Sequence, residues 1–289
     1  MAGGCAATQN AAPAASTTTA RQAATTRPAA AHAGRAFRDL ERAYDAHLGV
    51  WAVDTGSGRT VTWHANRRFG YASTHKVLTA ATVLRRIPRR LGHVVHYTKA
   101  DLVDYSPITE KHVGTGMTVR ALCDAALRYS DNTAANLLFR QIGGPQGLKA
   151  ELRGMGDRIT MPSRIEPDLN EAAPGGVRDT STPRAMGTDL RKLSLGGALP
   201  AKGRVRLNDW MRRNTTGGTL IRAGLPKAWT VGDKSGSGGY GTRNDIAVAW
   251  PPHQAPVVIA IMTTREKKTA NYNDALIAKA AKTVTQTLN

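Results

Sequence analysis

The chain has 289 residues, of which 41% are hydrophobic and 21% charged. This composition is typical of a folded protein of one large or two modest domains and unlike that of a disordered chain. The longest apolar runs, such as residues 257–262, have only the length of a strand, so we expect no transmembrane segment.

The net charge of +19 makes nucleic acid the first partner to consider. The basic residues, however, occur in short scattered groups, and aromatic residues make up only 5%, too few for the stacking platforms of single-strand binders. We find no helix-turn-helix, zinc-finger or RRM pattern. We therefore predict no nucleic-acid partner and interpret the charge as a solvated basic surface.

Residues 1–33 are rich in Ala and Thr and carry almost no large apolar side chains, which predicts a disordered tail. Residues 1–5 (Met-Ala-Gly-Gly-Cys) lack the charged and apolar regions of a complete signal peptide, but they resemble the end of a bacterial lipoprotein signal. Two interpretations stay open: either Cys5 is lipidated and the tail is a tether, or Cys5 has no role. We expect a secreted or cell-envelope protein, anchored through Cys5 in the first case.

Ordered structure is expected from Gly34. Apolar residues at helical spacing predict a helix to about His47, and two strands follow at 48–53 and 60–64. Residues 71–212 show helical and loop patterns. The helices expected there cover residues 77–86, 119–129, 133–141 and 184–195. Strand patterns return at 229–233, 245–250 and 257–263, and a last helix covers 274–288.

Strand-forming segments thus lie at both ends of the chain, with helical segments between them. The simplest architecture is an α/β (α+β) fold in which residues 34–68 and 214–289 form an antiparallel sheet flanked by N- and C-terminal helices. An all-helical domain, residues 69–213, is inserted into it and carries an active-site loop around 161–180. We expect the ligand cleft between the two parts.

The second cysteine, Cys123, follows a helical pattern and is predicted to be a small buried hydrophobic residue. A structural zinc site is excluded for want of ligands, and we expect neither a metal nor a cofactor.

The first motif with chemical meaning is Ser73-Thr74-His75-Lys76, which precedes a helical pattern. Residues i and i+3 of a helix share one face, so Lys76 can reach the Ser73 hydroxyl and hold or accept its proton. A serine needs such a partner to act as a nucleophile. Alone, this short pattern is more often a helix start with an exposed lysine.

A second motif, Ser130-Asp131-Asn132, lies between two predicted helices and can aim a hydroxyl and an amide at one cleft. In isolation the same residues are better explained as a helix N-cap.

A third motif, Lys234-Ser235-Gly236, ends a strand pattern. It can present cationic and hydroxyl groups to an anionic substrate, with backbone N–H groups as an oxyanion hole and glycine allowing close approach. In isolation an ordinary glycine-rich hairpin is the better explanation.

In this order the three motifs resemble the Ser-x-x-Lys, Ser-Asp-Asn, Lys-Thr-Gly series of penicillin-recognising serine enzymes, with Ser in place of Thr. The segment 164–170 (Arg-Ile-Glu-Pro-Asp-Leu-Asn) is similar to the Glu-Pro-Glu-Leu-Asn loop of class A β-lactamases. The resemblance covers about residues 35–288. It implies a serine β-lactamase that opens the ring of penicillins and cephalosporins, confers antibiotic resistance and acts as a monomer on a small-molecule substrate.

The resemblance also implies roles for individual residues. Ser73 would attack the β-lactam carbonyl, with Lys76 and Glu166 sharing the general-base work and Ser130 passing a proton to the ring nitrogen. Glu166 with Asn170 would position the water that hydrolyses the acyl-enzyme.

Substrate-binding and structural residues follow from the same resemblance. Asn132 would hold the substrate's side-chain amide, and Lys234 with Ser235 its carboxylate. The backbone N–H groups of Ser237 and Ser73 would form the oxyanion hole, and Gly236 would allow the substrate to approach closely. Tyr105 would form a wall of the cleft, and Arg222 would support carboxylate binding. Arg164 and Asp179 would form an ion pair that closes the loop.

His75 departs from the family, whose members usually carry an aromatic residue there. It can alter the packing beneath the nucleophile or add a titrating group beside Lys76, and we favour the packing role. Two other functions stay open as alternatives, a D-alanyl-D-alanine peptidase and a non-hydrolysing penicillin-binding sensor. Both would be expected to lack a deacylating carboxylate such as Glu166.

Overall fold

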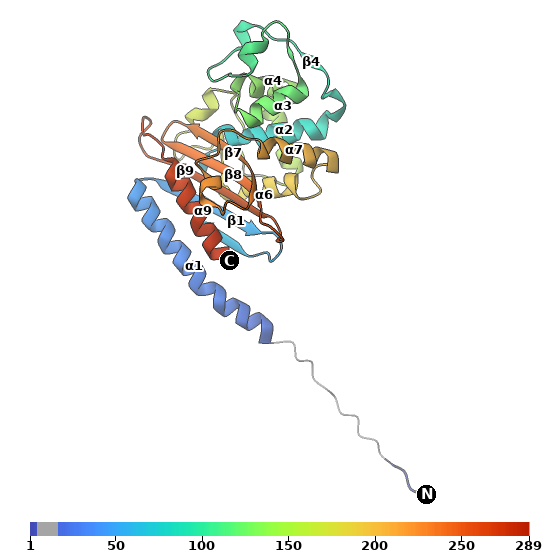
Figure 1. Cartoon of the computed structure of the whole chain (residues 1–289), viewed down its shortest axis with the longest axis vertical. Coiled ribbons are helices and arrows are strands. Elements are labelled where there is room, and N and C mark those ends of the chain that lie inside the picture. Colours follow the sequence, from blue (N-terminus) through green and yellow to red (C-terminus); the bar gives the residue numbers. More distant parts are fainter. Residues whose placement is uncertain (5–16, 289) are drawn as a thin grey trace.

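The structure is a computed structural model that describes residues 1–4 and 17–288. Figure 1 shows two parts, a sheet with long helices along one side and a helical part beside it. Cys5 lies outside the described residues, so its lipidation stays a prediction. Within those residues, no helix has both the length and the apolar character that a membrane crossing requires.

Within residues 17–288, five strands form one antiparallel sheet in the order β2-β1-β9-β8-β7. They are β1 (His47–Asp54), β2 (Thr60–Trp63), β7 (Thr230–Gly238), β8 (Thr242–Trp250) and β9 (Val257–Thr264). Strands from both ends of the chain therefore meet in one sheet, as the sequence predicts. The register pairs Val50 of β1 with Ile261 of β9, and Lys234 of β7 with Ile246 of β8.

Both faces of the sheet are covered, which explains why β1 is buried along its length. On one face, Leu48 and Val50 pack with residues of α1 and α9, two helices that lie side by side along the sheet (Figure 1). On the other face, Trp51 packs in a core that includes residues of α6. Alternate residues of a strand point to opposite faces, so each face of β1 contributes to a different core.

The middle of the chain is mainly helical. The helices of the whole fold are α1 (Thr17–Tyr44), α2 (His75–Arg86), α3 (Val119–Arg128), α4 (Asn132–Ile142), α5 (Gly144–Gly154), α6 (Pro183–Ser194), α7 (Ala201–Arg212), α8 (Ile221–Gly224) and α9 (Asp274–Leu288). Short 3-10 turns are η1 (Ala72–Thr74), η2 (Pro88–Arg90), η3 (Lys99–Asp101), η4 (Thr109–His112) and η5 (Asp168–Glu171).

Three details differ from the sequence prediction. The inserted region is not purely helical, because β3 (Phe69–Gly70) pairs with β6 (Thr180–Ser181), and β4 (Val94–Val95) with β5 (Met117–Thr118). The strand expected at 229–233 continues to Gly238, since its glycine-rich end pairs with β8. The first helix begins at Thr17 rather than Gly34, so the tail predicted for residues 1–33 is helical from residue 17; alanine, frequent there, has the highest helix propensity.

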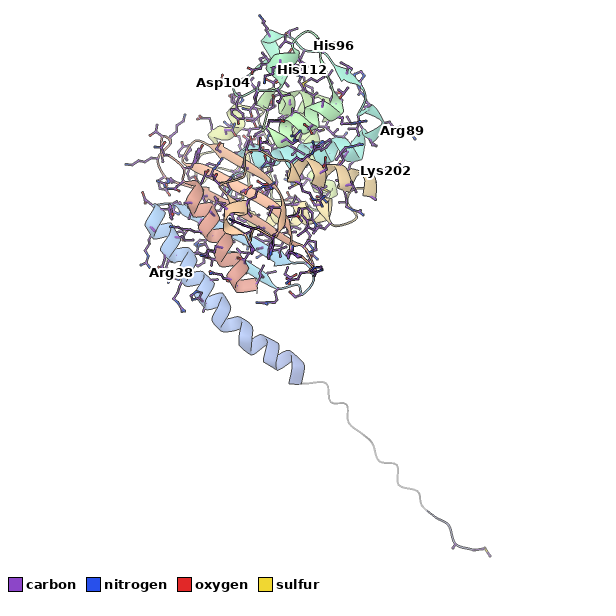
Figure 2. The ribbon with its side chains drawn as sticks, viewed as in Figure 1. Arg38, Arg89, His96, Asp104, His112 and Lys202 are labelled. Atoms are coloured by element: carbon purple, nitrogen blue, oxygen red, sulfur yellow. The ribbon has the colours of Figure 1, made fainter. Side chains whose placement is uncertain are left out.

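Basic side chains are distributed over both parts of the molecule. In Figure 2 Arg38 projects from α1, whereas Arg89 and Lys202 project from the helical part. The interpretation of the basic charge as a solvated surface stays a prediction.

Candidate active site

A cleft of about 530 Å³ opens where the helical part meets strands β7 and β8. Eight of the residues assigned from the sequence line it: Ser73, Tyr105, Ser130, Asn132, Asn170, Ser235, Gly236 and Ser237. The structure thus brings together four motifs that are far apart in the chain. Tyr105 stands at the cleft with 60% of its surface exposed, as expected for a wall residue.

Ser73 lies in η1, the 3-10 turn that leads into α2. The preceding Ala72 has φ +46°, a left-handed conformation that is uncommon for a residue with a side chain and marks a sharp turn before the serine. Strand β7 runs against this turn, and a Cβ at Gly236 would lie 3.0 Å from the Ser73 backbone nitrogen. Glycine at 236 therefore allows the edge strand to approach the serine backbone closely.

Lys76 lies at the centre of the polar network and is fully buried. Its Nζ is 2.7 Å from Oγ of Ser73, 2.8 Å from the carbonyl oxygen of Ser130 and 2.6 Å from Oδ1 of Asn132. It is also 3.0 Å from Oε1 of Glu166. The lysine is thus not the exposed side chain that the short motif alone suggested.

Glu166 is held by donors on both carboxylate oxygens. Oε1 lies 3.3 Å from the Ser73 hydroxyl, and Oε2 accepts a 2.5 Å hydrogen bond from Nδ2 of Asn170. The backbone of Glu166 is fixed by Asn136, whose side-chain amide bonds both its N–H and its carbonyl oxygen, at 2.9 and 2.8 Å. The carboxylate predicted for deacylation therefore lies beside the nucleophile.

Burial and charge set the protonation of this network. Burial lowers the pKa of Lys76, and the negative charge of Glu166 opposes that shift. For Glu166 burial alone would raise the pKa, but the charge of Lys76 and the hydrogen bond from His75 hold it well below its usual range. The carboxylate is therefore ionised at neutral pH and forms an ion pair with Lys76.

Lys234 is buried beside the cleft and bonds two of the residues that line it. Its Nζ donates to Oγ of Ser130 at 3.0 Å and to the carbonyl oxygen of Ser235 at 2.7 Å. Burial, together with the positive charge of Lys76, lowers the pKa of Lys234 to about 7. The hydroxyl of Ser130 therefore lies within reach of two lysines, since it is also 3.3 Å from Nζ of Lys76.

The loop that carries Glu166 is closed by the ion pair expected from the sequence, with Nε of Arg164 2.6 Å from Oδ2 of Asp179. The other oxygen of Asp179 accepts from the backbone N–H groups of Ser163 and Arg164 and from the hydroxyl of Tyr71, at 2.9 to 3.0 Å. The buried Asp179 carboxylate thus joins the two ends of the loop.

Arg222, which was expected to support binding of the substrate carboxylate, does not line the cleft. It is paired with the buried Asp233 and donates to the backbone carbonyls of Met211 and Arg212. Arg243 of β8 lines the cleft instead, with its Nε 2.7 Å from Oδ1 of Asp274.

His75 packs and also makes polar contacts. Its ring stacks on Phe139, with centroids 5.1 Å apart and planes at 9°, which agrees with the packing role. Its Nε2 lies 3.3 Å from Oε1 of Glu166, so it also belongs to the catalytic network.

The family model described as "Beta-lactamase enzyme family" matches residues 32–288. The chain belongs to this family. A β-lactamase of Amycolatopsis lactamdurans is 59% identical over 247 residues, which are 85% of this chain and 82% of the relative. A β-lactamase of Bacillus subtilis (strain 168) is 55% identical over 249 residues, 86% of this chain and 81% of the relative.

Solved structures agree with this membership. The crystal structure of a class A β-lactamase from Clostridium kluyveri DSM 555 matches with a TM-score of 0.87 and 49% identity, covering 88% of this chain and 98% of that one. A β-lactamase structure from Streptosporangium roseum matches with a TM-score of 0.87 and 46% identity, covering 89% and 98%. The chain is therefore a class A serine β-lactamase by family, and the predicted fold class is confirmed.

Four cleft residues were missed by the sequence analysis: Thr215, Thr216, Arg243 and Tyr272. Arg243 lies opposite Ser237 in the β7–β8 register, so it reaches the cleft only because this hairpin forms. The strand expected at 245–250 begins at Thr242 in the structure, so Arg243 fell outside the expected strand and no local pattern marked it. Among the described residues, no group of three or more His, Cys, Asp or Glu side chains is arranged to hold a metal ion.

Proposed function

We propose that this chain hydrolyses β-lactams through an ester on Ser73 and that Glu166 drives the release of that ester. The observation that carries the proposal is the position of the Glu166 carboxylate, 3.3 Å from the Ser73 hydroxyl and hydrogen-bonded to Asn170. A peptidase or a penicillin sensor with the same serine and lysine needs no such carboxylate. The β-lactamase names of the relatives support the same substrate class.

The geometry supports acylation as follows. Transfer of a proton from Lys76 to Glu166, 3.0 Å apart, leaves a neutral amine 2.7 Å from the Ser73 hydroxyl. This amine takes the hydroxyl proton as Oγ attacks the lactam carbonyl, and the N–H groups of Ser73 and Ser237 stabilise the oxyanion. The C–N bond then breaks, and Ser130 passes its proton to the ring nitrogen and is reprotonated by Lys76.

Deacylation requires a water activated by Glu166. Oε2 of Glu166 accepts from Nδ2 of Asn170, whose Oδ1 is buried and has no hydrogen-bond partner among the described residues. Glu166 first returns the proton that it took during acylation to the neutral Lys76, 3.0 Å away. The freed carboxylate and Oδ1 of Asn170 can then hold a water that attacks the ester carbonyl while Glu166 takes its proton. The C–O bond to Ser73 breaks as the Ser73 oxygen takes a proton from Lys76. Glu166 passes its proton back to Lys76, and the ring-opened acid leaves.

The substrate carboxylate meets a cationic end of the cleft. Ser235 and Arg243 line this end, with Lys234 buried beneath Ser235 and bonded to its carbonyl oxygen. We assign carboxylate binding to these three residues. On this assignment Arg243→Ala raises KM for carboxylate-bearing β-lactams, whereas Arg222→Ala affects mainly stability through the buried Asp233.

The function is tested by combining turnover with intact mass. The wild type should open a chromogenic cephalosporin without added zinc. Glu166→Ala should accumulate an adduct of one substrate mass, which should be absent from Ser73→Ala. Asp168→Ala, which removes an exposed acid of the same loop, is the matched control and should turn over normally.

Two outcomes contradict the proposal. Turnover by Ser73→Ala excludes the ester mechanism. A stable adduct on the wild type, without turnover, would instead identify a penicillin-binding sensor.

We also propose that the protein is a monomer outside the cytoplasm, anchored through Cys5. The charge of +19 favours separate molecules in solution, and the sequence before Cys5 supports lipidation. Light scattering tests the first point. Metabolic labelling with a fatty acid, compared between wild type and Cys5→Ser, tests the second.

A further inference from the structure

His75 makes one polar contact with each of its ring nitrogens. Nε2 is 3.3 Å from Oε1 of Glu166, and Nδ1 is 3.1 Å from Oγ1 of Thr79. The side chains of His75 and Glu166 have no exposed surface. Water therefore does not compete for these contacts, and the protein partners determine how the ring is protonated.

These partners select one tautomer. An ionised carboxylate can only accept a hydrogen bond, so the ring proton lies on Nε2 and points to Glu166. Nδ1 is then the acceptor for the Thr79 hydroxyl. The ring plane is held by Phe139, stacked at 5.1 Å, and by Tyr71, tilted at 5.7 Å. Packing thus fixes the direction of the Nε2–H donor.

The charges around the ring keep it neutral. Glu166 faces it from the active-site loop, Lys76 from its own helix and Lys234 from β7, while the phenol of Tyr71 has a pKa well above its usual value and is uncharged. Burial is the main influence and lowers the pKa of His75, the two lysines act in the same direction, and Glu166 opposes them. At neutral pH His75 is therefore a neutral donor.

We propose that His75 is a positioning residue for Glu166, donating Nε2–H to Oε1 so that the carboxylate stays ionised and aligned for deacylation. The proposal rests on the deacylating role of Glu166 given above. Without His75 as a donor, Oε1 keeps only Ser73 and Lys76 as polar neighbours. Glu166 is then protonated at higher pH, and release of the ester on Ser73 begins to slow at a higher pH on acidification.

Three substitutions of His75 distinguish loss of its hydrogen-bond donor from loss of its ring packing. His75→Phe keeps an aromatic ring against Phe139 but has no donor. His75→Gln places an amide nitrogen near the position of Nε2 and restores a donor that does not titrate. His75→Asn places its amide near Nδ1, within reach of Thr79 and not of Glu166.

The readouts are the acid limb of the pH profile of kcat and the fraction of acyl-enzyme during turnover at pH values on that limb, measured by intact mass. A hydrogen bond to a buried charged group is worth about one to two pKa units, so the acid limb of His75→Phe should move upward by about one pH unit or more. His75→Asn should move in the same way, and both variants should accumulate acyl-enzyme at pH values on the acid limb where the wild type does not. The acid limb of His75→Gln should lie at the wild-type pH, whatever its maximal rate.

Two results overturn the proposal: an unshifted acid limb in His75→Phe and His75→Asn, or a His75→Gln limb shifted as far as that of His75→Phe. The second result would assign the effect to packing. If His75→Phe does not fold, the Gln and Asn variants decide the question, because they differ in which ring nitrogen they replace. Failure of this inference is distinct from failure of the function, which Glu166→Ala tests separately by its adduct.

Discussion

Asp179→Asn is the sharpest test of how the active-site loop is held. The Asp179 side chain has no exposed surface and accepts hydrogen bonds from four donors, three on Oδ1 and the Arg164 guanidinium on Oδ2. Its φ is +57°, a conformation that asparagine also tolerates, so the substitution alters charge and leaves the backbone unstrained. The change therefore isolates the electrostatic contribution.

The magnitude follows from those contacts. Hydrogen bonds to a charged group contribute about 1.5–3 kcal/mol each, against about 0.5–1.5 kcal/mol for neutral pairs. In the variant, the three hydrogen bonds to Oδ1 become bonds to a neutral amide. The new NH₂ group replaces Oδ2 and faces the Arg164 guanidinium, so that contact has two donors and no acceptor. Arg164 is 28% exposed and can recover water, which reduces the cost. The three bonds to Oδ1 lose about 1–1.5 kcal/mol each, and the hydrated Arg164 adds little. We therefore expect a loss of about 3–5 kcal/mol, or about 2–4 °C in Tm for each kcal/mol.

Urea unfolding measures the global loss, and hydrogen exchange at the Ser163 and Arg164 amides measures local opening of the loop. Glu166 takes a proton in both steps, so both should slow. Deacylation should slow more, because it also depends on the water that Glu166 and Asn170 hold, and both residues are on this loop. Asp168→Asn, an exposed acid on the same loop, should stay within about 0.5 kcal/mol of the wild type. If Asp179→Asn behaves like this control and its amides exchange at wild-type rates, the reasoning is wrong.

Three further predictions concern other parts of the fold. Gly217→Ala places a Cβ 1.6 Å from Oδ2 of Asp233 and should cost about 1–3 kcal/mol in chemical denaturation, whereas Gly218→Ala, with no atom within 4 Å, should cost far less. Because burial lowers the pKa of Lys234 to about 7, its positive charge is present below that pH and lost above it. We therefore expect kcat/KM for anionic β-lactams to fall as pH rises through 7, and the non-titrating Lys234→Arg to lack this limb. Burial raises the pKa of the Cys123 thiol well above its usual value, so a thiol reagent should label a Cys5→Ser protein only after unfolding; labelling of the native protein would contradict this.

The features that sequence could predict are those governed by short-range geometry or by motif order. The three-residue spacing of Ser73 and Lys76 places both on one helical turn, and in the structure Nζ of Lys76 lies 2.7 Å from Oγ of Ser73. Short apolar runs rich in β-branched residues located the strands of the sheet, apart from the glycine-rich end of β7. The order of the motifs identified the family, and the occurrence of strand patterns at both ends of the chain predicted that these strands meet in one sheet.

The features that sequence missed depend on contacts between residues that are far apart in the sequence. Arg243 enters the cleft through its register with β7, and no local pattern specifies that register. Arg222 was assigned to support of the substrate carboxylate because it matches an arginine that some family members use in this way. The structure pairs it instead with the buried Asp233, which lies elsewhere in the sequence. The contact of His75 with Glu166 joins residues from two separate motifs, so only the folded chain reveals it.

The position of β9 has a consequence for how the chain folds. This strand is the last of the sheet in sequence but lies at its centre, between β1 and β8. During synthesis β1 can pair with β2 alone until the region of Val257–Thr264 has emerged, so an apolar strand edge stays open while the whole helical part is made. Contacts between such distant segments slow folding, and an open apolar edge favours aggregation. Chains that end before β9 should therefore be aggregation-prone rather than simply inactive.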